Sequence, residues 1–270
     1  MKSRSLTPGL LFLALAGLAF MAAAARAGTY GGGTGEPNDP FLIYDANQMN
    51  AIGANPGDWD KDFKLMADIN LGDYTGTEFN MIGNFGDRFS GVFDGNGHEI
   101  SNFNFSSSAI QYVGIFGVVE GPGEIRDLSL KDVNVVVPSG YCVAGIVGRL
   151  LYGTVSGCSV IGGSVGFASA SDVGGLVAYN EVGLVSDSYA QCLVVGEYCT
   201  GGVVGSNRGG TVIRCGADCD VRCYIAAGGG LVGENNAQYD PGPEGIVVDS
   251  FATGYVSGYD STGGLVGTNG

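Results

Sequence analysis

The chain has 270 residues, of which 50 are glycine, while 14% are charged and 45% are hydrophobic. This composition can bury a sizeable core, which excludes extensive disorder, and the glycines show no three-residue period, which excludes collagen. The formal net charge of −15 makes nucleic acid and anionic lipid poor partners, so we expect an acidic, folded protein that binds neither.

The first 27 residues are typical of a secretion signal. Lys2 and Arg4 precede an apolar stretch over residues 10–25, and an A-x-A cleavage site follows at residues 25–27. The apolar stretch is shorter than the ~20 residues that a membrane-spanning helix needs. Cleavage removes three basic residues, which leaves 12 − 3 = 9 basic against 27 acidic ones. We expect a protein that is secreted or held at the cell surface, with no membrane insertion after cleavage.

Two segments precede the main body of the chain. Residues 28–40 are rich in glycine and are predicted to form a linker, and residues 41–90 are predicted to form an N-terminal cap. Within that cap, Asp45 and Gln48 have the spacing of a capping box for one short helix over residues 46–52. Such a cap is needed because the open end of a stack of strands exposes unpaired backbone groups.

From residue 91 to residue 270 the chain repeats one apolar, glycine-bounded phrase, of which GGLVG is an example. Its second glycine recurs at intervals of 31, 30, 27, 28 and 34 residues, at Gly114, Gly145, Gly175, Gly202, Gly230 and Gly264. SGVFDG, which contains Gly91, is interpreted as an earlier variant. Self-similarity of this length indicates a solenoid, in which each repeat is one turn of a coil.

Each repeat has a second half that opens with another glycine and continues with small or apolar residues at fixed offsets. The residues two positions after this glycine are Ile125, Val155, Val185, Val212 and Val247. Along residues 214–225, apolar and cysteine side chains alternate with others, which is the period of a strand with one buried face. We therefore predict an all-β fold, a parallel β-helix of about seven coils with interior ladders about 4.8 Å apart. Glycine at the corners is expected to supply positive φ angles and to let coils approach closely.

The GGLVGSN-like phrases, followed by GxVxxSxAxGxV as in residues 245–256, resemble the GLUG-motif repeats of bacterial secreted proteins. The resemblance covers roughly residues 91–270, and the preceding segment resembles the capping segment ahead of such repeats. It implies an adhesin-like β-solenoid at the cell surface and names no ligand. Because the last phrase lacks a second half, we expect a C-terminal truncation, with continuation into further repeats.

One irregularity predicts a binding surface. The segment ENNAQYDPGPE, residues 234–244, is longer than its counterparts, and insertions in a solenoid project from one edge and often carry binding. The candidate contact residues of this segment are Asn235, Tyr239 and Asp240. A second candidate is the acidic pair Asp218 and Asp220, which the alternating pattern places on one face of a strand.

The sequence offers little support for catalysis. The spacing of Asp218 and Asp220 overlaps that of inverting glycosidases, but Arg214 and Arg222 flank the pair and would neutralise it. His98 is the single histidine and lies in a glycine turn. The aspartates of residues 58–62 lack the glycine and glutamate of an EF-hand. We predict no catalytic residues, no metal and no cofactor.

Seven cysteines are present, none of them in a C-x-x-C motif. Cys192 and Cys219 both stand nine residues after the second-half glycine of successive coils. Their Cα atoms are therefore expected about 4.8 Å apart, inside the range for a disulfide. Most of the other cysteines are predicted to be small fillers of the interior.

The leading hypothesis is a secreted, non-catalytic β-solenoid that acts as an extracellular or cell-surface binding or adhesion module for a glycan or a surface protein. One alternative is a carbohydrate-active β-helix enzyme resembling polysaccharide lyases or hydrolases, and another is a structural spacer of a longer surface protein. The enzyme requires acids stacked on adjacent coils. In the outward column, however, acids alternate with other residues: Asp127, Gly157, Asp187, Arg214 and Asp249.

Overall fold

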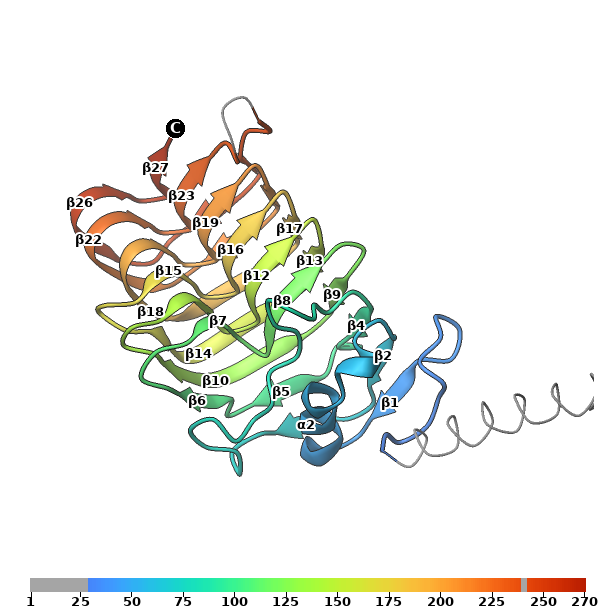
Figure 1. The fold of residues 1–270 in the computed structure, drawn as a ribbon. Helices are drawn as coiled ribbons and strands as arrows, with labels where there is room; N and C mark the ends of the chain where they lie inside the picture. The colour runs from blue at the N-terminus through green and yellow to red at the C-terminus, as the bar shows by residue number, and fades with distance from the viewer. Residues whose placement is uncertain (1–28, 239–241) are drawn as a thin grey trace, which may run out of the picture.

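The computed structural model describes residues 29–238 and 242–270 and shows a parallel β-solenoid of about seven turns (Figure 1). Strands of successive turns pair in parallel, as Phe41 with Phe63 and Val155 with Val185. The predicted fold, an all-β parallel β-helix with a short helix near its N-terminus, is confirmed. The expected secretion signal over residues 1–27 lies outside the described residues.

Three sheets form the sides of the solenoid. The first contains β1 (Phe41–Ile43), β2 (Phe63–Leu65), β4 (Val92–Asp94), β9 (Glu124–Arg126), β13 (Thr154–Ser156), β17 (Leu184–Ser186), β20 (Thr211–Ile213) and β24 (Ile246–Val248). The second contains β8 (Phe116–Glu120), β12 (Val147–Leu151), β16 (Val177–Glu181), β19 (Val204–Arg208), β23 (Val232–Asn236) and β27 (Val266–Asn269). The third contains β3 (Ile69–Asn70), β5 (Glu99–Ser101), β6 (Asn104–Ser106), β7 (Gln111–Val113), β10 (Ser129–Val136), β11 (Tyr141–Ala144), β14 (Ser159–Gly166), β15 (Ser171–Gly174), β18 (Tyr189–Gly201), β21 (Gly216–Ala217), β22 (Asp220–Gly229), β25 (Phe251–Ala252) and β26 (Val256–Gly263).

The interior consists of columns of residues that stack from one turn to the next. Val155 pairs with Val185, and Val185 pairs with Val212. All three side chains are fully buried. Val247 continues the column on the next turn and is partly buried. The predicted interior ladder is therefore confirmed, and each turn adds one apolar layer to a continuous core.

The recurring glycines serve close contact between turns. A Cβ atom on Gly175 would lie 2.1 Å from the carbonyl oxygen of Gly202, and one on Gly202 would lie 2.2 Å from that of Gly230. Neither glycine has a positive φ angle. Positive φ angles occur instead at another corner, at Asp127 and Asp187. The expectation that the phrase supplies positive φ is wrong, whereas the expected close approach is confirmed.

Gly91 belongs to the second series of glycines. Val92 pairs with Glu124, which places Gly91 beside Gly123, the glycine that opens the second half of a repeat. The backbone N–H of Glu124 donates to the carbonyl oxygen of Gly91 at 3.0 Å. The interpretation of SGVFDG as an early copy of the first phrase is therefore wrong, because the register joins it to the other half.

The glycine-rich stretch before β1 is packed against the fold. Tyr30 is 3% exposed, and its ring centroid lies 4.6 Å from that of Phe41 and 5.5 Å from that of Phe63. The backbone N–H of Gly31 donates to the carbonyl oxygen of Leu42 at 2.8 Å. The expected linker over residues 28–40 is corrected by this packing, because the described part from residue 29 contributes an aromatic ring to the core.

The helix α2 (Ala46–Ala54) lies at the N-terminal, blue end of the solenoid and is followed by the short 3₁₀ helix η1 (Pro56–Asp58) (Figure 1). Asp45 accepts a hydrogen bond from the N–H of Gln48 at 2.9 Å, as the capping prediction required. The side chain of Gln48 accepts in turn from the N–H of Tyr44 at 2.7 Å. The two buried residues of the helix are Met49 and Ile52. They cover apolar surface at this end of the core.

A ladder of buried asparagines runs through the later turns. Asn180 donates to Asn207 and Asn207 donates to Asn235, each at 2.7 Å. Asn235 donates to Asn269 at the same distance. Each of the three donors also bonds the carbonyl oxygen of a second-half glycine, at Gly183, Gly210 and Gly245. The ladder provides partners for both ends of the Asn207 and Asn235 amides and couples neighbouring turns, whereas the buried Oδ1 of Asn180, where the ladder begins, has no partner among the described residues.

Candidate functional site

One corner of the solenoid carries a column of left-handed residues. Tyr112, Cys142, Asp172 and Cys199 occupy matching positions on β7, β11, β15 and β18. Their φ angles are 59°, 58°, 50° and 45°, although none of them is glycine. Because Asp187 has the same conformation at another corner, the backbone angle is a property of the fold. What distinguishes this column is its side chains.

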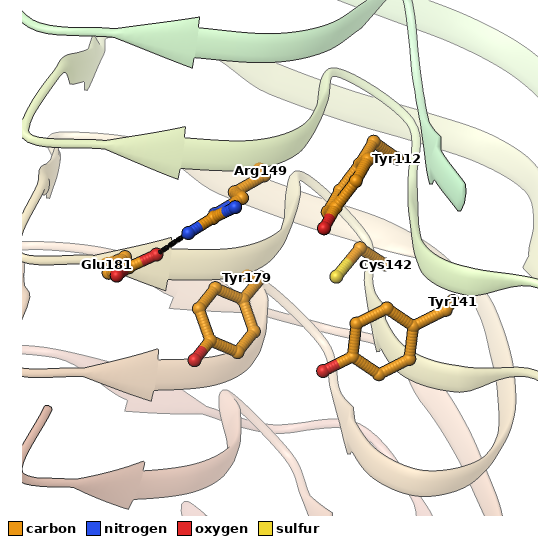
Figure 2. Close-up of a pocket in the computed structure, with 6 residues that line it drawn as sticks. All are labelled: Tyr112, Tyr141, Cys142, Arg149, Tyr179 and Glu181. Carbon is orange, nitrogen blue, oxygen red and sulfur yellow. Dashed lines mark hydrogen bonds and ion pairs between the residues drawn. The ribbon is translucent and has the colours of Figure 1, made fainter. Parts of the chain in front are cut away.

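A groove lies between this column and the outward face of the second sheet (Figure 2). Tyr112, Tyr141 and Cys142 line it from β7 and β11, and Arg149, Tyr179 and Glu181 line it from β12 and β16. The cavity volume is about 270 Å³. Tyr141 is 40% exposed, whereas Cys142 is buried, so the phenol rings are the accessible surface and the thiol lies beneath them.

An ion pair crosses one side of the groove. Arg149 donates from Nε to Glu181 Oε2 at 2.9 Å and also bonds that oxygen through Nη2. The guanidinium lies between two rings, 5.8 Å from the Tyr112 centroid and 5.9 Å from the Tyr179 centroid. Gln238 donates to the other oxygen of Glu181 at 2.6 Å. Both charges are therefore held in fixed positions.

Asp172 lies beside the groove and is 6% exposed. Burial raises the pKa of this carboxyl to about 6, although the hydrogen bond from the Tyr141 hydroxyl acts in the opposite direction. The charge of Glu234 adds to the rise, and the Cys199 thiol and the Arg208 guanidinium oppose it. A buried carboxyl group with a raised pKa therefore lies next to a groove tyrosine.

Three side chains of the groove, Tyr141, Cys142 and Tyr179, have raised pKa values. Burial raises the pKa of Tyr179 to about 12, and burial together with the charge of Asp172 raises the pKa of Tyr141. Burial also raises the pKa of the Cys142 thiol well above its usual value. At neutral pH the phenols are hydrogen-bond donors, and the thiol is a poor nucleophile because the thiolate is the reactive form.

The structure places the residues predicted for the long segment as follows. Asn235 is 6% exposed and belongs to the asparagine ladder, so its prediction as a surface contact is corrected: its amide bonds Asn207, Asn269 and Gly245. Tyr239 and Asp240 lie outside the described residues. Gln238, from the same segment, reaches the groove through its bond with Glu181.

The acidic pair lies away from the groove and has local partners. Asp218 accepts from Gln191 at 3.1 Å and from Thr253 at 3.2 Å. Asp220 accepts from Arg222 at 2.6 Å. The predicted neutralisation by Arg222 is present for Asp220. The predicted neutralisation by Arg214 is wrong, because Arg214 donates to Asp187 instead. A binding role of this pair stays a prediction.

The outward column predicted to alternate in charge contains an ion pair between successive turns. Arg214 donates to both oxygens of Asp187 at 2.6 Å. The two side chains are about half exposed, so the pair contributes little to stability.

The same turns place Cys192 beside Cys219, because Ala190 pairs with Ala217. Cys192 and Cys219 are both free and buried in this structure, and the Cys219 thiol donates to the carbonyl oxygen of Gly202 at 3.6 Å. Their predicted adjacency is confirmed, and their disulfide stays a prediction. His98 does not line the groove, and its Nδ1 lies 3.0 Å from Asp68 Oδ1. Within residues 29–238 and 242–270, no group of three or more histidine, cysteine or acidic side chains is placed to hold a metal ion.

Sequence reasoning did not find the groove, although a positional signal exists. Cys142, Asp172 and Cys199 each stand three residues before the second glycine of the repeated phrase. Arg149 and Tyr179 each stand four residues after it. Polar or aromatic residues at these two offsets mark the two walls of the groove.

The fold and groove define a β-solenoid with a lateral aromatic site. A scan of protein families finds no match, so no family model supports the resemblance to GLUG-motif repeats. The chain is 33% identical over 158 residues to halomucin of Haloquadratum walsbyi, which covers 54% of this chain and 2% of halomucin. It is 33% identical over 139 residues to a protein of Evansella cellulosilytica named "Putative Gly-rich membrane protein", which covers 50% of this chain and 16% of that protein.

The chain therefore spans a small part of the length of these curated relatives. Among solved structures, a Bacteroides ovatus protein named as a "putative immunoglobulin A1 protease" has a TM-score of 0.57 and 18% sequence identity. The match covers 89% of this chain and 74% of that one, and it shows a shared fold. In the described part of the chain, we find no helix with the length and apolar character needed to cross a membrane.

Proposed function

We propose that this protein is an extracellular, cell-surface β-solenoid that binds a glycan in its tyrosine groove without modifying it. The observation that carries the proposal is the groove itself, in which Tyr112, Tyr141 and Tyr179 surround the Arg149–Glu181 ion pair. A sugar ring has an apolar face of C–H groups and a rim of hydroxyls. Tyrosine offers both an apolar ring and a polar end, so it suits such a ligand.

The surroundings of the groove support binding over catalysis. Both oxygens of Glu181 accept hydrogen bonds from protein side chains, one from Arg149 and the other from Gln238, so the carboxyl group is already engaged within the protein. The Tyr141 and Tyr179 phenols have raised pKa values and act as donors. The alternative of a carbohydrate-active enzyme requires an acid and a base placed at one bond of the substrate.

The export context rests on the sequence and on the relatives. The signal-like first 27 residues direct the chain out of the cytoplasm. Halomucin and the glycine-rich membrane protein carry names that suit the cell surface, and we extend that location to this chain. A rigid rod is suited to this place because its stacked turns hold a binding surface at a fixed distance from its ends.

Binding to an array of immobilised glycans tests the proposal. The parent protein is expected to bind a subset of glycans, and the double variant Tyr141→Ala/Tyr179→Ala is expected to lose at least about tenfold in affinity, as aromatic anchors of a site do. Tyr255→Ala is the matched control, because Tyr255 is 68% exposed on another turn. Equal loss in both variants, or binding to no glycan, would contradict the proposal.

A further inference from the structure

The groove has room for one small ring. Its cavity volume of about 270 Å³ lies just below the ~300–1,000 Å³ of sites for drug-sized ligands. Beyond its outer end, Phe85 stacks on Tyr112 with ring centroids 6.0 Å apart and an angle of 12° between the planes. Phe85 is 60% exposed, so this stacked pair extends the aromatic surface outward. The shape suits one enclosed sugar residue of a longer glycan.

The polar groups of the groove suit hydroxyls. The Arg149 guanidinium can only donate hydrogen bonds and the Glu181 carboxylate can only accept them. The Tyr179 hydroxyl can do both, and the Tyr141 hydroxyl, which donates to Asp172, can still accept. These groups lie around one cavity, as Figure 2 shows. A sugar hydroxyl both donates and accepts, so neighbouring hydroxyls can bond Arg149 and Glu181 without breaking their ion pair.

The charges near the groove disfavour an anionic ligand. Each guanidinium already has a carboxylate partner, Arg149 with Glu181 and Arg208 with Glu234 at 2.5 Å. Asp172 adds a further carboxyl, which carries charge at neutral pH because its pKa is about 6. Near the groove, negative groups therefore outnumber positive ones. The formal net charge of −15 for the whole chain acts in the same direction.

We propose that the groove selects an uncharged sugar ring, a neutral hexopyranose residue, over a uronic acid or a sulfated sugar. This inference rests on the proposed function and deepens it, because it names the class of glycan. A carboxylate on the ligand would have to compete with Glu181 for Arg149, or to lie against the charges of Glu181 and Asp172. A neutral ring meets neither obstacle.

Calorimetric titration of the full exported chain with matched oligosaccharides tests this selectivity. The probes are a glucose oligosaccharide and a galactose oligosaccharide, each paired with its uronic acid counterpart of equal length. The neutral member is expected to bind at least about tenfold more tightly in low salt, and added salt is expected to narrow the gap because it screens repulsion. Equal binding, or tighter binding of the uronic acid, would overturn the inference and leave the proposed function intact.

Two variants assign the selectivity to the groove. Glu181→Gln removes one negative charge while keeping an acceptor for Gln238. This variant is expected to reduce the difference in affinity between the neutral and the acidic probes. Tyr255→Ala is expected to leave the gap unchanged. Thermal unfolding of each variant shows whether it is folded, and the salt series on the parent needs no variant. If none of the probes bound and the glycan array were also blank, the proposed function itself would fail.

Discussion

The two ends of the solenoid fill the same interior column with different side chains. In the first sheet the column begins with Phe41, Phe63 and Phe93, whose positions pair from turn to turn. It continues with Ile125, Val155, Val185, Val212 and Val247. Among the described residues, every ring-to-ring contact joins two residues of the range 30–116. The same backbone architecture is therefore compatible with bulky aromatic rings in the irregular turns and with β-branched side chains in the repeating turns.

The reason lies in the glycines. In the repeating turns they bring the backbones of successive coils together at the corners, as the contact of Gly175 with Gly202 shows. Identical corners give identical interior widths, which one valine per turn fills. The early turns lack this regularity, and aromatic rings of different orientation fill their less uniform interior.

The largest effect is expected from shortening a ring in the aromatic part. Phe93→Ala removes a fully buried side chain whose ring centroid lies 5.2 Å from that of Phe116, and it should cost about 3–5 kcal/mol of unfolding free energy. Val185→Ala in the same column should cost about 2 kcal/mol. Chemical denaturation measures both. Equal losses would show that the two regions are packed alike.

The next largest effect is expected in the asparagine ladder of the later turns. Asn207→Ala removes the donor to Asn235 and the acceptor of Asn180, and we expect a loss of about 3 kcal/mol because buried polar groups lose partners. Asn269→Ala is the matched control, since Asn269 is exposed at the end of the ladder. Denaturant unfolding of the two variants should separate them; a larger loss at Asn269 would contradict the assignment.

The later turns also contain the cysteine pair. Oxidation of Cys192 and Cys219 by glutathione disulfide, which takes up the two hydrogens of the thiols, is expected to form one internal bridge and to raise the unfolding free energy by about 2–4 kcal/mol. Peptide mapping without reduction identifies the bridge. Cys158→Ala should not prevent it, because the Cys158 thiol bonds a backbone oxygen of another column. A bridge that joined other cysteines would refute the pairing.

A smaller effect concerns Asp172, whose folded pKa of about 6 lies above its ordinary value of 3.8. Its contribution to stability is present below pH 3.8 and is lost as the pH rises through about 6, because the folded state binds the proton more tightly. Asp172→Asn should remove this dependence. The groups that interact with Asp172 are Tyr141, Cys142, Tyr179, Cys199, Arg208 and Glu234.

The measurement is the difference in unfolding free energy between Asp172→Asn and the parent at pH 4 and at pH 7. Relative to the parent, the variant should be more stable at pH 7 than at pH 4 by about 2 kcal/mol, as a shift of about two pKa units implies. Asp218→Asn serves as the control, because Asp218 is partly exposed and lies on another face. If both variants showed the same pH dependence of unfolding free energy, Asp172 would not be its source.

The sequence predicts the interior better than the groove, and the reason is physical. Val155, Val185 and Val212 share both residue type and offset because one packing requirement acts on all of them. The groove has no such repetition: its column contains a tyrosine, cysteines and an aspartate in one backbone conformation. Its ion pair also depends on Gln238, which is 57 residues from Glu181. The repeat pattern predicts which residues pair between turns, but it does not predict the position of Gln238, because Gln238 lies in a segment that is longer than its counterparts in the other turns.

The asparagine ladder gives the rod a direction. Asn180, Asn207 and Asn235 each donate toward the following turn, and Asn269 accepts the last bond, so the side-chain dipoles line up head to tail along the axis. Aligned dipoles polarise one another, and each further turn of the same kind meets a stronger acceptor or donor than an isolated amide would offer. The two faces of a single turn are thus electrically unlike, and only one order of stacking matches them.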